Sequence, residues 1–160
     1  MSLRLNPALA RELFGQARAA APEGVALELM LEDTNSELTR FANNAIHQHV
    51  AESTLTLSLR AELDGRTARA TGHCLDDTGL RSLVQRTLNL TRSQAPDAEL
   101  LPMAAPAPIR PLERWEDATA ALTPAQRAET VAAMVEVAKA DSLTAAGICS
   151  SQSGAFAIVN

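Results

Sequence analysis

The chain has 160 residues, of which 46% are hydrophobic but only 2% aromatic, and a formal net charge of −5 at pH 7. This length fits one compact domain or two small lobes, with a core built mainly from Leu, Ala and Val. Nucleic-acid binding needs phosphate neutralisation and stacking aromatics, so the acidic charge and the scarcity of aromatics exclude DNA and RNA as expected partners. Two distant cysteines and the lack of a long apolar run favour a cytoplasmic protein without disulfides, signal peptide or membrane span.

The first fifty residues predict a helix followed by short strands. Asn6 and Pro7 form a good helix start, and apolar residues at helical spacing continue to Ala21. The apolar period then changes to two, which predicts three strands separated by polar turns: 25–32, 37–42 and 45–50. The turns are predicted at 33–36 and at Asn43-Asn44.

The segment 53–73 predicts a β-hairpin with a defined register. Apolar and polar residues alternate on both sides of Asp64-Gly65, a preferred two-residue hairpin turn. If these two residues form the loop, three cross-strand pairs follow: Leu63 with Arg66, Ala61 with Ala68, and Leu59 with Ala70.

A helix capped by Asp76 or Asp77 is expected next, ending near Pro96. Five prolines between Pro96 and Pro111 predict an extended connector. Thr123-Pro124 begins another helix through a capping box, and its predicted buried stripe is Val131, Met134, Val135 and Ala138. Two final strands are predicted at 143–150 and 155–160, joined through 151–154.

Few parallel crossovers are implied, so the sequence predicts an α+β fold with a mixed, mostly antiparallel sheet and about three helices. The order helix, strand, strand occurs near both ends and suggests a degenerate repeat. The expected organisation is an N-terminal lobe (1–95), a Pro-rich connector (96–122) and a helix-strand-strand unit (123–160) that packs on or extends the same sheet.

Three histidines are candidates for metal binding. His47 and His49 lie two apart in a predicted strand, so both imidazoles could reach one ion, and His73 could supply a third ligand. Such pairs are common without metal on solvent-exposed or hydrogen-bonded strand faces, a catalytic zinc normally needs three protein ligands, and no HExxH spacing exists in the chain. We therefore expect no metal site and no cofactor in these residues.

Arg60 and Arg69 are candidates for contact with a peptide or partner. The predicted register places them opposite each other, where like charges repel unless an anion lies between them. A peptide carboxylate or an acidic partner surface could be that anion. The alternative is that the diagonal neighbour Glu62, or solvent, relieves the repulsion.

No catalytic group is predicted. The serines at 150, 151 and 153 lie in a predicted turn without a nucleophile elbow, and Cys74 directly follows His73, so the two side chains would point to opposite strand faces.

The ordered combination of several motifs resembles the N-terminal domain of the TldD/PmbA family. These motifs are the string from Leu38 to Gln48, the Asp64-Gly65-Arg66 hairpin, Leu75-Asp76-Asp77 opening a helix, and a Thr-Pro-capped helix followed by the strand of Gly147 and the end at Val159-Asn160. Proteins of this family were first described as modulators of DNA gyrase and are understood as peptide-processing metalloprotease subunits.

The resemblance implies a scaffold and assembly domain without its own active site. Active members of the family hold zinc through an HExxxH helix in a later C-terminal domain, and their partner subunits lack those ligands. The resemblance therefore implies zinc only outside this segment, and a homologous subunit, in a homo- or heterodimer, and a peptide substrate as partners.

Two alternatives remain open: a stand-alone interaction module that pairs through its sheet edges, and a small metal-binding protein using the three histidines. The apolar strand 155–160 ends without a polar tail, so we expect that the natural chain continues past Asn160 or that a partner covers this strand.

Overall fold

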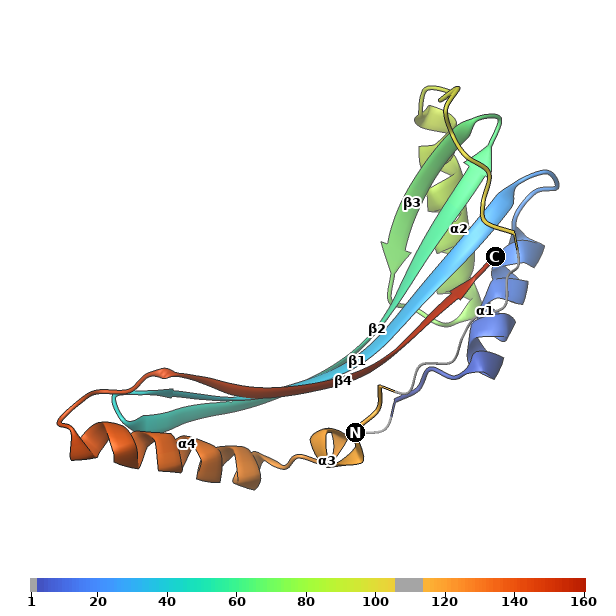
Figure 1. Cartoon of the computed structure of the whole chain (residues 1–160). Helices are drawn as coiled ribbons and strands as arrows, with labels where there is room; N and C mark the ends of the chain where they lie inside the picture. The colour runs from blue at the N-terminus through green and yellow to red at the C-terminus, as the bar shows by residue number, and fades with distance from the viewer. Residues whose placement is uncertain (1–2, 106–113) are drawn as a thin grey trace. The chain divides into compact units, whose positions relative to one another are not determined.

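The protein has an α+β fold, as the sequence predicts (Figure 1). The computed structural model describes residues 3–105 and 114–160. These described residues form three long helices, one short helix and four strands, in chain order: α1 (Pro7–Ala20), β1 (Ala26–Ala42), β2 (Ala45–Leu63), β3 (Arg66–Gly72), α2 (Asp77–Ser93), α3 (Asp117–Ala120), α4 (Pro124–Ala140) and β4 (Gly147–Val159). The strands form one antiparallel sheet in the order β3-β2-β1-β4, so β3 and β4 are its edges.

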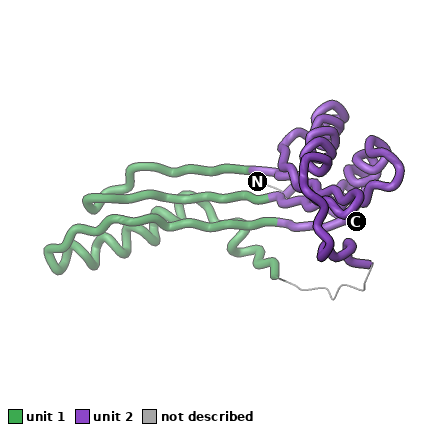
Figure 2. The backbone as a smooth tube through the Cα atoms, turned by 90° about the horizontal axis from the view of Figure 1, so that it is seen from above, with its two compact units in different colours: residues 1, 34–53, 111–154 green, residues 2–33, 54–110, 155–160 purple. Residues whose placement is uncertain are grey.

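The chain divides into two compact units, coloured separately in Figure 2. Unit 1 contains residues 34–53 and 111–154, and unit 2 contains residues 2–33, 54–110 and 155–160. Strands β1, β2 and β4 each contribute one part to each unit.

The core of unit 2 is built from aliphatic residues on one face of the sheet and from α1 and α2. Buried positions in the strands recur at every second residue, as a sheet with one covered face requires. The same cluster includes residues from both helices, so α1 and α2 cover this one face. Its fully buried members include Leu29, Leu57, Leu59, Leu80 and Val84.

The β2–β3 hairpin confirms the predicted turn and register. Asp64 and Gly65 have the positive φ angles of 51° and 69° that this two-residue turn requires. The observed partners include Leu63 with Arg66, Ala61 with Ala68, and Leu59 with Ala70. Leucines therefore lie opposite small residues on the covered face.

Helix α2 begins with Asp76 as its cap. The Asp76 carboxylate accepts a hydrogen bond from the Gly79 amide at 2.7 Å. Asp77 instead lies in the first turn, where a hydrogen bond from the Arg81 side chain lowers the pKa of its carboxyl group. The sequence alone did not decide which of these two aspartates caps the helix, and the structure shows that it is Asp76.

Unit 1 is organised around a buried arginine in α4. The side chain of Arg127 is 1% exposed and forms an ion pair with Glu37 of β1 at 2.7 Å. It also donates to the Leu122 carbonyl at 2.9 Å and to the Ser151 hydroxyl of β4 at 3.1 Å. One guanidinium thus joins α4 to two strands, beside a small apolar cluster of Phe41, Val131 and Val135.

The β1–β2 turn is also fixed by side-chain hydrogen bonds within unit 1. Asn43 and Asn44 have φ angles of 51° and 60°, as predicted for a turn with positive φ. The Asn44 amide group donates to the Leu143 carbonyl at 3.0 Å and accepts from the Ala145 amide at 2.7 Å. The segment that leads into β4 is therefore attached to this turn.

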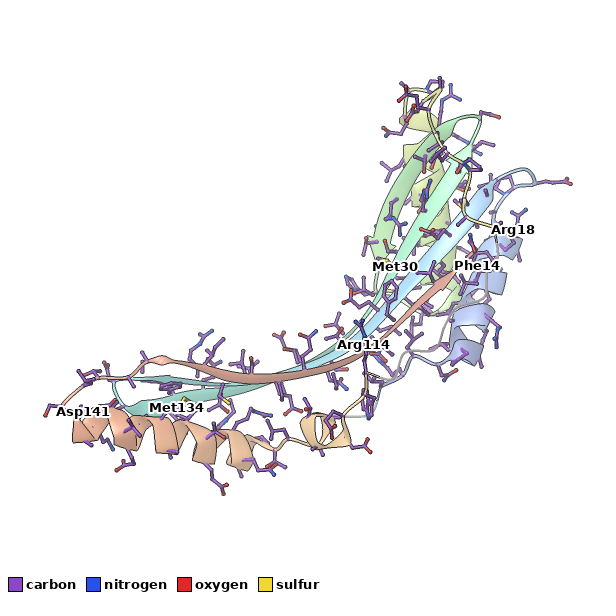
Figure 3. All side chains as sticks on the ribbon, in the orientation of Figure 1. Phe14, Arg18, Met30, Arg114, Met134 and Asp141 are labelled. Carbon is purple, nitrogen blue, oxygen red and sulfur yellow. The ribbon has the colours of Figure 1, made fainter. Side chains whose placement is uncertain are left out.

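Four local predictions were wrong. The strand predicted at 45–50 does not end there, because β2 is continuous from Ala45 to Leu63. The polar residues 33–36 do not form a turn, because β1 continues through them to Ala42. Residues 151–154 do not separate two strands, because β4 is continuous, so the C-terminal part does not repeat a helix-strand-strand order. Met134, labelled in Figure 3, is 44% exposed, because the buried stripe of α4 runs through Arg127, Val131 and Val135.

The predicted connector is described only in part. Residues 106–113 lie outside the described residues, and α3 lies in its second half. Among the helices of residues 3–105 and 114–160, none is long and apolar enough to cross a membrane.

The substitution Arg127→Met is expected to destabilise unit 1 by about 3 kcal/mol, because it removes one partner of a largely buried ion pair and leaves Glu37 without its cation. Trp115, the only tryptophan of the chain, belongs to unit 1, so its fluorescence during urea unfolding reports this change.

The control is Lys139→Met in the same helix. It breaks only the exposed Lys139–Glu136 pair and should cost less than about 0.5 kcal/mol. Equal urea midpoints for the two variants would contradict the role given to Arg127.

Candidate functional site

The two edges of the sheet differ in how they are protected against further strand pairing. Edge strand β3 has only seven residues and carries Arg66 and Arg69. Edge strand β4 has thirteen residues without a charge or a proline. Since charges and short length are the usual protection of a sheet edge, β4 is the edge suited to bind another strand.

The part of β4 in unit 2, residues 155–159, exposes large apolar side chains. Phe156 is 60% exposed and Ile158 is 52% exposed. The alternate residues Ala155, Ala157 and Val159 instead pack against the core of unit 2. We call the outer backbone edge of residues 155–159 the β4 edge.

A groove of about 350 Å³ runs along the β4 edge. Five residues at the beginning of α1 and just before it form one side, and residues 155–159 form the other: Leu5, Asn6, Pro7, Ala10 and Arg11. Consecutive strand residues point to opposite faces, so a cavity lined by five of them in a row must lie along the edge of the strand. We call this cavity the α1–β4 groove.

The wall of the groove formed by the N-terminal segment is held by Asp33. The Asp33 side chain is almost fully buried, and its carboxylate accepts hydrogen bonds from the amides of Arg4 and Leu5, the latter at 2.8 Å. The Arg4 guanidinium adds an ion pair at 3.3 Å. Leu5 is thereby fixed where it lines the groove.

Helix α1 begins at the groove with its first amides already bound. The Asn6 side chain accepts from the amides of Ala8 and Leu9, both at 3.0 Å, and the Asn6 carbonyl accepts from Ala10. Pro7 has no N–H to offer. The polar chemistry of this wall is therefore set by the exposed side chain of Arg11, for which the structure gives no ion pair with another described residue.

The three candidate histidines are not brought together in one unit. His47 and His49 lie in the part of β2 that belongs to unit 1, whereas His73 belongs to unit 2. His47 Nε2 lies 3.0 Å from the Ala42 carbonyl, and His49 Nδ1 lies 2.8 Å from the Thr39 hydroxyl. Within the described part of the chain, no three His, Cys, Asp or Glu side chains are grouped so that they could hold a metal ion.

Arg60 and Arg69 lie opposite each other, as the register predicts, and both have partners within the chain. Arg60 donates to the Thr67 hydroxyl at 3.1 Å and lies 3.7 Å from the Glu62 carboxylate. Arg69 forms an ion pair with Glu28 and donates to the Ser58 carbonyl at 3.3 Å. Each of the two arginines thus has a carboxylate partner within the chain, and their contact with a peptide or partner stays a prediction.

No family model and no curated protein matches the sequence, but solved structures match the fold. TldE from Thermococcus kodakarensis superposes with a TM-score of 0.75 at 13% identity, over 94% of this chain and 34% of that chain. The chain has the fold seen in TldE. A "putative modulator of a DNA gyrase" from Thermotoga maritima gives a TM-score of 0.70 at 14% identity, again over 94% of this chain and 34% of that chain.

A third solved structure has the same fold over most of this chain. A "putative modulator of DNA gyrase" from Bacteroides thetaiotaomicron gives a TM-score of 0.69 at 17% identity, over 96% of this chain and 40% of that chain. The resemblance found in the sequence is thus confirmed at the level of the fold. The chain spans about a third to two-fifths of the length of these proteins.

The sequence indicated the strand of the site but not the groove. The uncharged apolar run 155–159 pointed to an edge in need of a partner. Arg11 and Leu5 were not singled out, because nothing local in the sequence shows that the beginning of α1 lies beside β4.

The substitution Asp33→Asn should release the N-terminal wall of the groove. An amide cannot replace a carboxylate that accepts from several donors, and the loss should be about 1–3 kcal/mol. Hydrogen exchange of the Leu5 amide measures it directly and should accelerate at least fivefold.

The matched control is Glu32→Gln at the exposed neighbouring position. It should leave the exchange rate of the Leu5 amide unchanged. Unchanged protection of Leu5 in the Asp33→Asn variant would refute the anchoring role of Asp33.

Proposed function

We propose that this chain is the N-terminal scaffold and assembly domain of a TldD/PmbA-like zinc peptidase, or of its non-catalytic partner subunit, and that it takes part in peptide processing or degradation. The fold shared with TldE supports this family. The observation that carries the proposal is the β4 edge, an uncharged edge strand with exposed Phe156 and Ile158 beside an open groove.

In this role the domain holds an extended chain by adding it to the sheet. Backbone groups along the β4 edge supply hydrogen bonds that do not depend on the bound sequence. Such binding suits a protein that handles peptides of varied sequence or pairs with a homologous subunit. Zinc and the hydrolytic step belong to a C-terminal domain with the HExxxH helix, which the 160 residues do not contain.

The alternative is a stand-alone interaction module that pairs through the β4 edge and has no connection to hydrolysis. The same edge supports it, because strand addition requires no catalytic group. The reading frame that follows Asn160 in the gene separates the candidates. A frame that encodes HExxxH favours the active subunit, a long frame without it favours the partner subunit, and a stop codon favours the module.

The double substitution Phe156→Lys and Ile158→Lys should weaken strand addition, because it places two charges along the β4 edge while leaving the core-facing alanines intact. The probe is a fluorescein-labelled, amidated ten-residue peptide of alternating valine and threonine, and its binding is followed by fluorescence anisotropy. Two cross-strand contacts of about 0.2–1 kcal/mol each predict a loss of about two- to thirtyfold in affinity.

The control is Thr71→Lys, which places a lysine at an exposed position of the opposite edge strand β3. Its affinity for the peptide should equal that of the unsubstituted chain. If the double variant binds as tightly as the control, strand addition at the β4 edge is wrong.

A further inference from the structure

We propose that the α1–β4 groove selects extended apolar segments that carry a carboxylate group, and that Arg11 binds this carboxylate. The inference rests on the proposed strand addition at the β4 edge and names the class of chain that would be added there. The chemistry on the two sides of the groove supports it.

The groove lies where the side chains of a fifth strand would be placed. A strand added beside residues 155–159 advances about 3.3 Å per residue, and every second side chain points toward the covered face. Over five residues, two or three side chains would therefore enter the space between β4 and the beginning of α1. The groove volume of about 350 Å³ lies in the range of sites that hold small ligands or several side chains.

The α1–β4 groove is lined mainly by apolar residues on both sides. Leu5, Pro7 and Ala10 line it from the N-terminal side, and the small side chains of Ala155 and Ala157 leave it open from the strand side. The groove would therefore favour a segment whose inward-facing side chains are aliphatic, because removing apolar surface from water is favourable.

One positive charge stands at this otherwise apolar groove. Arg11 is exposed and lines the groove, whereas Arg4, just before the lining residue Leu5, is already paired with Asp33. The first amides of α1 are bound by Asn6, so they do not compete for an anion. A carboxylate on the added segment would thus pair with the Arg11 guanidinium, whose two parallel N–H groups suit a planar carboxylate.

The charge of Arg11 favours a peptide over a second copy of this chain. In a pair of identical edges, the strand facing β4 would be another β4, which has no acidic residue to offer to Arg11. A peptide with an aspartate or glutamate among aliphatic residues satisfies both the groove and the arginine.

The test uses the alternating valine-threonine peptide with one threonine replaced by glutamate, at each position in turn, and a matching series with glutamine. At one or two positions the glutamate peptide should bind about two- to fivefold more tightly than its glutamine partner, as expected for a partly exposed ion pair. In the Arg11→Gln variant this difference should disappear, while binding of the neutral peptide is retained.

The control variant is Arg92→Gln, which removes an exposed arginine from the last turn of α2 and should keep the preference for glutamate. Equal binding of glutamate and glutamine peptides at every position, or a preference that survives Arg11→Gln, would overturn the assignment of Arg11. Failure of strand addition itself is seen separately, because the neutral peptide would then bind the Phe156→Lys, Ile158→Lys double variant as tightly as it binds the unsubstituted chain.

Discussion

The backbone along the edge of a β-sheet carries hydrogen-bonding groups that need partners, and this constraint explains much of the molecule. One edge, β3, is short and carries Arg66 and Arg69, the second of which is paired with Glu28. The other edge, β4, is long and uncharged and has apolar side chains on its exposed face. A charged edge resists further pairing and an uncharged one accepts it, so the two edges of one sheet have opposite tendencies.

The residues around the β4 edge leave a groove that is open and mainly apolar. Asp33 uses its buried carboxylate to hold the segment of Arg4 and Leu5 beside the strand, and Asn6 caps the helix that begins there. The polar groups of this wall are thereby satisfied within the protein, with Arg11 left facing the groove. The backbone amides of this wall are bound, and Arg11 has no ion pair with another described residue, so the groove distinguishes ligands by charge as well as by shape.

Local sequence patterns predicted those features whose causes are local. The register of the β2–β3 hairpin followed from Asp64-Gly65 and the alternation around it, and the caps Asn6 and Thr123 followed from their own neighbours. The errors came from polar residues whose partners are distant in the sequence. Asp33 was predicted in a turn but binds backbone amides 28 and 29 positions away, and Arg127, which the apolar pattern did not include in the buried stripe, is buried and binds Glu37. The groove escaped prediction for the same reason, since it requires α1 and β4 to be adjacent.

The most direct test of the account is amide hydrogen exchange along β4 with and without the valine-threonine peptide. The account predicts that alternate amides within residues 155–159 exchange rapidly in the free chain and become protected when the peptide binds, because a new strand pairs with every second residue of an edge. The amides of β3 should not change. Protection that appears at β3, or no new protection at residues 155–159 in the presence of bound peptide, would contradict it.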